Sequence, residues 1–104
     1  MIPVQVKDFV VRVLEETEKG YMIWNEGYDD SYFSERNNVT LHISHHFDDM
    51  RELNFYGFKI VIGHQVTPFT VTEDEQEYFF MKRLYEAISV NVHNISDSLK
   101  GFFD

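Results

Sequence analysis

The segment Val39-Thr40-Leu41-His42-Ile43-Ser44 alternates apolar and polar side chains throughout. Successive side chains of a strand point to opposite faces, so this pattern is typical of a strand with one buried face. The alternation breaks at 45–52, around Asp48-Asp49, and a longer strand is predicted from Leu53 to Ile62. The polar segment between the two strands predicts a hairpin and therefore an antiparallel sheet.

Further strands are predicted on both sides of this hairpin. The apolar period changes to two at Tyr21, so a strand is expected to follow the first helix directly. A short strand is predicted at 31–36, before a tight turn at Asn37-Asn38. The last strand is expected at 66–71, and it is an edge strand because Pro68 cannot donate to a ladder.

Two helical patterns flank the strands. Apolar side chains recur at three- and four-residue steps over 6–17, and Gly20 suits the left-handed position after the helix. A second helix is expected to begin at the capping box Thr72-Glu73-Asp74-Glu75 and to break near Asn94. The order helix, three to five strands, helix predicts one α+β domain over residues 1–104. In this fold an antiparallel β-meander is covered on one face by the N-terminal and C-terminal helices.

Composition narrows the functional classes. The chain has a formal charge of −9, from 18 acidic and nine basic residues, yet 43% of its residues are hydrophobic. Such a chain can fold, but it repels nucleic acid, so no direct nucleic-acid binding is expected. The absence of cysteine, of a secretory leader and of a long apolar run predicts a cytoplasmic protein without a membrane segment.

No catalytic or metal-binding motif is present. His42 and His46 would lie about 13 Å apart along one strand face, too far to share an ion unless the chain reverses after Ser44. His45, Asp48 and Asp49 complete no recognised ligand spacing, and no nucleophile elbow or glycine-rich phosphate loop occurs. We therefore expect no enzyme activity, no cofactor and no metal.

The acidic clusters are the remaining candidates for function. The cluster at Glu73 to Glu77 is explained by the start of a helix, which leaves two loops that can present carboxylates to a basic protein surface. Tyr28, together with Tyr32 and Tyr56, is expected to add aromatic anchors. The predicted partner-binding residues are Glu26, Tyr28, Asp29, Asp30, Asp48, Asp49 and Glu52.

The stretch from Leu14 to Trp24, LEETEKGYMIW, resembles the opening of small proteins encoded on bacterial prophages and other mobile elements. Those proteins carry Leu, Thr, Gly and Trp at this spacing, where the first helix turns into the sheet. The acidic helix-sheet-helix layout also looks like that of some phage anti-CRISPR proteins, which occupy the DNA-binding surface of an effector nuclease. This second resemblance concerns architecture alone.

These observations lead to three expectations of function. The first is a non-enzymatic, acidic protein-binding inhibitor of phage or prophage type, a DNA mimic in character, that acts on a host defence or nucleic-acid-handling protein. The second is an immunity or antitoxin-like protein that neutralises a basic toxin. The third is a small structural or assembly protein that forms a homo-oligomer.

Overall fold

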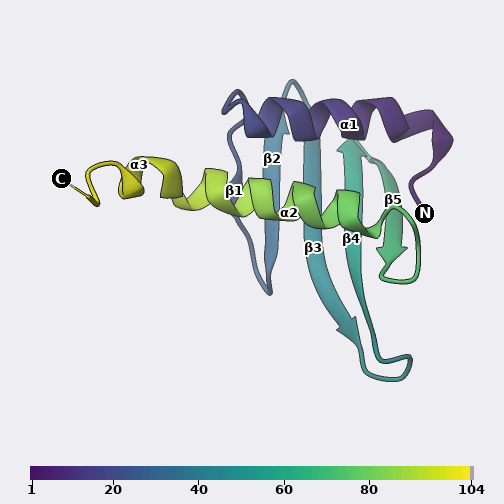
Figure 1. Ribbon diagram of the computed structural model, residues 1–104. Helices are drawn as coiled ribbons and strands as arrows, with labels where there is room; N and C mark the ends of the chain where they lie inside the picture. Colours follow the sequence, from purple (N-terminus) through teal and green to yellow (C-terminus); the bar gives the residue numbers. More distant parts are fainter. Residues whose placement is uncertain (104) are drawn as a thin grey trace.

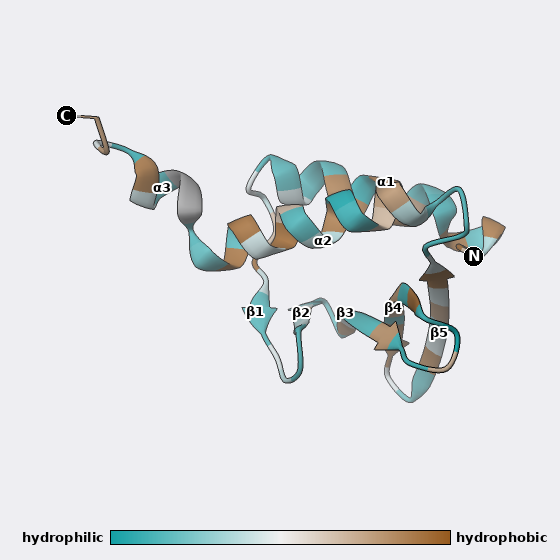
Figure 2. Cartoon of the chain, turned by 60° about the horizontal axis from the view of Figure 1, so that its bottom comes forward, coloured by the Kyte–Doolittle hydropathy of each residue, from teal (hydrophilic) through white to brown (hydrophobic). Residues whose placement is uncertain are grey.

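The computed structural model describes residues 1–103, with the side chains of Ile95 and Ser96 left out. A five-stranded antiparallel meander carries helices on one face, which confirms the predicted α+β architecture (Figure 1). Within residues 1–103 no helix lies over the opposite sheet face (Figure 2). In chain order the elements are α1 (Val4–Glu18), β1 (Asn25–Glu26), β2 (Ser31–Arg36), β3 (Val39–Asp48), β4 (Leu53–Ile62), β5 (Gln65–Thr72), α2 (Tyr78–His93) and α3 (Ile95–Leu99).

The core lies between the sheet and the two long helices. Ile43, Phe58 and Val71 project from β3, β4 and β5 and are at most 1% exposed. The helices contribute Val10, Met81, Leu84 and Ile88, none of which has any exposed surface. Full burial of such a side chain contributes roughly 1.5–3 kcal/mol, so this layer is what holds the helices on the sheet.

The hairpin of β3 and β4 is longer than predicted. β3 runs to Asp48 instead of ending at Ser44, and the pairing extends from Val39 opposite Ile62 to Asp48 opposite Leu53. β2 pairs with β3 only as far as Ser44, so the outer part of the hairpin leaves the sheet. In this outer part, the backbone of β3 stays paired with β4, but its side chains are less buried. Alternation of apolar and polar residues reflects burial and not backbone pairing, so it predicted too early an end for β3.

The predicted strand at Tyr21 is absent, and the first strand is β1. The backbone carbonyls that would pair with a neighbouring strand accept hydrogen bonds from side chains instead. Arg36 Nη2 donates to the Tyr21 carbonyl at 2.9 Å, and Ser34 Oγ donates to the Ile23 carbonyl at 2.7 Å. Asn91 Nδ2 likewise donates to the carbonyl of residue 22 at 3.1 Å. The segment 21–24 is therefore a connection outside the sheet, held by side chains from β2 and α2.

A buried tryptophan joins this connection to α1. The side chain of Trp24 is 4% exposed, and its indole N–H donates to Thr17 Oγ1 at 3.0 Å. Gly20 has φ +79°, the left-handed conformation expected after the helix. The motif from Leu14 to Trp24 thus reverses the chain and seals one end of the core.

The second helix begins later than its capping box predicts. The Thr72 backbone N–H donates to Glu75 Oε1 at 3.0 Å, but Thr72 is the last residue of β5 and α2 starts only at Tyr78. The intervening turn carries the chain from the sheet edge to the helical layer. The predicted break is confirmed, because Asn94 adopts φ 52° between α2 and α3.

In the described part of the chain, no helix is both long enough and apolar enough to cross a membrane.

Candidate protein-binding surface at the acidic end of the sheet

Both acidic loops lie at the same end of the sheet. In a meander, the β1–β2 and β3–β4 turns share one end and the β2–β3 and β4–β5 turns share the other. Figure 1 shows the β3–β4 turn projecting past the other strands, below both helices. β3 continues for four residues beyond its last pair with β2, or about 13 Å at 3.3 Å per residue. The predicted residues therefore form two groups, staggered along the strand direction.

The β1–β2 turn holds the first group. Asp29 and Asp30 both have positive φ, at 52° and 59°, a conformation that aspartate tolerates better than most residues. Both are exposed, as is Glu26, and Tyr28 is 92% exposed. The turn is nevertheless anchored, because Tyr85 Oη donates to the Asp30 carbonyl at 2.8 Å. Its carboxylates face solvent from a fixed backbone.

The β3–β4 turn holds the second group. Asp48 Oδ1 accepts the backbone N–H groups of Met50 at 3.0 Å and Arg51 at 3.2 Å, so this half-buried carboxylate shapes the turn. Asp49 and Glu52 are exposed. Because Asp48 is engaged in the turn, Asp49 and Glu52 are the acids most available to a partner. Arg51 belongs to the same turn and reduces its net negative charge.

Apolar side chains stand beside these acids. Met50 is 94% exposed at the tip of the hairpin, and Phe47, the second-last residue of β3, is 55% exposed. The sequence reasoning missed both, because it interpreted 45–52 as a polar break. Phe47 shares the strand face of Ile43, which is fully buried, but it lies past the point where the helices cover that face.

Two predicted anchors are instead part of the core. Tyr32 is 7% exposed and Tyr56 is 4% exposed, and both rings pack on Tyr85 of α2, with centroids 5.3 and 5.4 Å away. Burial raises the pKa of Tyr56 far above its ordinary value and that of Tyr85 to about 12. This tyrosine cluster fixes α2 on the sheet and cannot reach a partner.

The three histidines do not meet. His45 lies on the helix-facing side of β3, with its ring 5.1 Å from that of Tyr56, whereas His42 and His46 lie on the uncovered face. The His46 ring nitrogen Nε2 is hydrogen-bonded with Ser44 Oγ at 2.7 Å. Among the described residues, no group of three or more histidine, cysteine or carboxylate side chains could hold a metal ion.

The uncovered face of the sheet differs in charge from the loops. Phe33, His42, Lys59 and Pro68 form one row across β2 to β5, and the His46 ring stacks on Phe55 at 5.0 Å. Burial, and then Lys59, lower the pKa of His42, so Lys59 supplies the main charge of this row at neutral pH. The row itself contains no carboxylate, and the nearest acid of β2 on this face is Glu35, two residues after Phe33.

Comparisons with protein-family models, with curated proteins and with solved structures found no match to this chain.

Proposed function

We propose that this chain is a non-enzymatic protein-binding module, and that the acidic end of the sheet is its binding surface. One observation carries the proposal: Tyr28, Phe47 and Met50 are exposed there among carboxylates. Protein interfaces combine aromatic and methionine anchors with a polar rim, and each of the two loops offers such an anchor beside its carboxylates.

The chemistry of this surface favours a basic partner. Asp29 and Asp30 follow Tyr28 in the β1–β2 turn, Asp49 and Glu52 lie beside Met50 in the β3–β4 turn, and the chain as a whole carries −9. A field of this sign accelerates encounter with a positively charged groove and opposes nucleic acid. We extend the proposal to an inhibitor of phage or prophage type, whose target is a defence or nucleic-acid-handling protein with such a groove. An immunity or antitoxin-like role would use the same surface against a basic toxin.

Affinity capture from a bacterial extract tests the proposal, followed by titration of the purified captured protein. Met50→Ser and the pair Asp49→Asn with Glu52→Gln should each weaken binding at least tenfold. The matched control is Val66→Ser, an exposed apolar residue of β5 outside the acidic loops. Raising the salt concentration should weaken wild-type binding and should have less effect on the Asp49→Asn, Glu52→Gln variant.

Two results would oppose the proposal. One is a captured protein that binds the Met50→Ser and charge variants as tightly as the wild type. The other is a partner whose binding is lost through Val66→Ser alone. The identity of the captured protein separates the two finer roles, since a toxin would indicate neutralisation and a defence or nucleic-acid-handling protein would indicate inhibition.

A second candidate function is self-association through the uncovered sheet face. The row of Phe33, His42, Lys59 and Pro68 contains a cation and no carboxylate, so two copies with a charge of −9 can meet there with less repulsion than at the acidic loops. Light scattering coupled to size exclusion tests this directly. A dimer that Phe33→Glu converts to monomer would support it, and a monomeric wild type would exclude it.

A further inference from the structure

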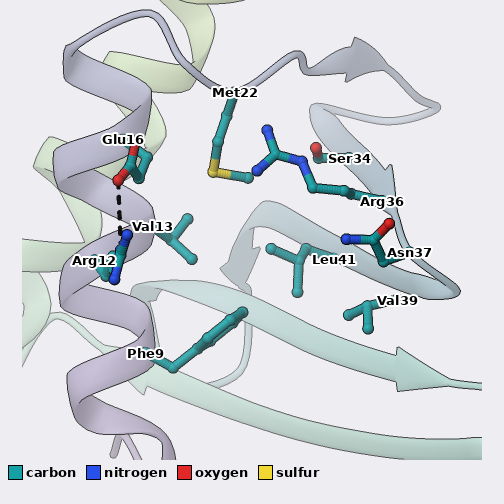
Figure 3. A pocket seen from close by; sticks show the side chains of 10 residues that line it. All are labelled: Phe9, Arg12, Val13, Glu16, Met22, Ser34, Arg36, Asn37, Val39 and Leu41. Carbon is teal, nitrogen blue, oxygen red and sulfur yellow. Dashed lines mark hydrogen bonds and ion pairs between the residues drawn. The ribbon is translucent and has the colours of Figure 1, made fainter.

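A cavity of about 270 Å³ opens between α1 and the sheet at the end opposite the acidic loops. Figure 3 shows its apolar wall, which Phe9 and Val13 of α1 form together with Met22 and with Val39 and Leu41 of β3. A cavity of ~150 Å³ already accepts benzene, and drug-sized ligands occupy cavities above ~300 Å³. The space therefore suits a small molecule with an apolar portion.

Polar groups converge at one side of this cavity. Arg36 ends β2 and Asn37 begins the following turn, and Figure 3 shows both side chains directed over the cavity. Arg36 Nη2 donates to the Tyr21 carbonyl at 2.9 Å, which holds the guanidinium in place and leaves its other N–H groups for a ligand. A guanidinium beside an amide is a donor set for a carboxylate.

The charge around the cavity is unusual for this chain. Arg12 on the α1 side pairs with Glu16, with 3.4 Å between Arg12 Nε and Glu16 Oε1, so these two side chains contribute no net charge. Arg36 has no carboxylate within 4.0 Å among residues 1–103. In a chain with twice as many acids as bases, the cavity therefore carries a local positive charge.

We propose that this cavity binds a small amphiphile with a carboxylate head, of which a straight-chain alkanoate is the simplest example. The alkyl chain lies against Phe9, Val13 and Leu41, and the carboxylate accepts hydrogen bonds from Arg36 and Asn37. The site is independent of the acidic surface, because the two lie at opposite ends of the sheet.

Methionine methyl groups offer a built-in readout. Met22 lines the cavity, Met50 is 94% exposed at the far hairpin, and Met81 of α2 is fully buried. With ¹³C-methyl methionine, titration with octanoate should shift the Met22 resonance in a saturable way and leave those of Met50 and Met81 in place. The neutral analogue 1-octanol should bind about tenfold more weakly, because a charge-assisted hydrogen bond is lost.

Three variants assign the head-group site. Arg36→Gln should lower the ratio of octanoate affinity to 1-octanol affinity about tenfold, whereas any loosening of segment 21–24 through loss of the bond to the Tyr21 carbonyl would weaken both ligands alike. Asn37→Asp keeps a residue that tolerates the φ of 52° at this position and places a negative charge beside the head group, so it should also weaken octanoate selectively. Arg51→Gln removes a cation from the acidic end and should change nothing.

The proposal is overturned if the Met22 resonance does not respond to millimolar octanoate. It is equally overturned if octanoate and 1-octanol bind alike and neither variant changes their ratio, since the site would then be apolar only. An unshifted Met81 resonance in each variant shows that the core remains folded. Loss of binding to a protein partner at the acidic surface would leave these titrations unchanged.

Discussion

Replacing Thr17 with valine removes one buried hydroxyl and keeps the shape of the side chain. The Thr17 hydroxyl accepts the indole N–H of Trp24 at 3.0 Å and donates to Met22 Sδ at 3.8 Å. Thr17 is 3% exposed and Trp24 is 4% exposed, so the indole N–H has no route to water. A buried donor left without a partner costs about 1–3 kcal/mol. We expect Thr17→Val to lower the free energy of unfolding by about 2 kcal/mol.

Two reference variants separate the hydrogen bond from packing. Thr17→Ser keeps the oxygen and loses a methyl group, which costs about 1 kcal/mol whether or not Trp24 is present. In a Trp24→Phe background no indole N–H remains, so Thr17→Val should then cost little. The coupling free energy from this double-mutant cycle should be at least about 1 kcal/mol.

Urea denaturation followed by far-ultraviolet circular dichroism measures Thr17→Ser and the four proteins of the cycle, because Trp24 is the only tryptophan and its fluorescence is lost in two proteins of the cycle. A drop of 2 kcal/mol corresponds to a decrease in Tm of about 8 °C for a domain of this size. A cost below about 0.5 kcal/mol, or an equal cost with and without the indole, would refute the role assigned to this hydrogen bond.

Three further predictions concern pH and backbone conformation. The hydrogen bond from the Thr72 N–H lowers the pKa of Glu75. This carboxylate therefore stabilises the fold at pH values above its unfolded pKa, and the effect is lost as pH falls through its folded pKa. In Glu75→Gln, the free energy of unfolding measured by urea denaturation should depend less on pH in that acid range. Burial raises the pKa of Tyr85 to about 12, so the stabilisation of the fold by its neutral hydroxyl is complete below about pH 10 and is lost between about pH 10 and 12. Tyr85→Phe should remove a late step from the ultraviolet titration of tyrosine ionisation. Asn94 has φ 52°, so Asn94→Ala should lower stability by about 1 kcal/mol while Asn94→Gly should not, as thermal unfolding can check.

Much of the secondary structure followed from local patterns. β2 and β4 occupy the predicted residues, and Asn37 and Asn38 both take the positive φ of a tight turn. Period-two hydrophobicity and the steric freedom of glycine and asparagine act over a few residues, so they can be recognised without knowing what packs nearby. The same reason explains why the break at Asn94 was predictable.

The errors arose where distant residues decide the outcome. Residues 21–24 have the composition of a strand, but side chains from β2 and α2 take their backbone hydrogen bonds. Thr72 and Glu75 form the contact of a capping box, yet pairing with Phe55 keeps Thr72 in β5 and delays the helix. Local propensity competes here with tertiary contacts, and the tertiary contacts prevail.

The sequence by itself determined an α+β meander with a strong acidic excess, because alternation and charge are properties of the chain. Only the tertiary structure decided which aromatic residues a partner can reach. The helices cross the upper part of the strands, so Tyr32 and Tyr56 beneath them are buried. Phe47 is also an aromatic residue on the helix-facing side of the sheet, but it lies beyond the helices and is exposed. The cavity beside Arg36 arises likewise from where α1 meets the sheet, a matter of packing between segments far apart in the chain.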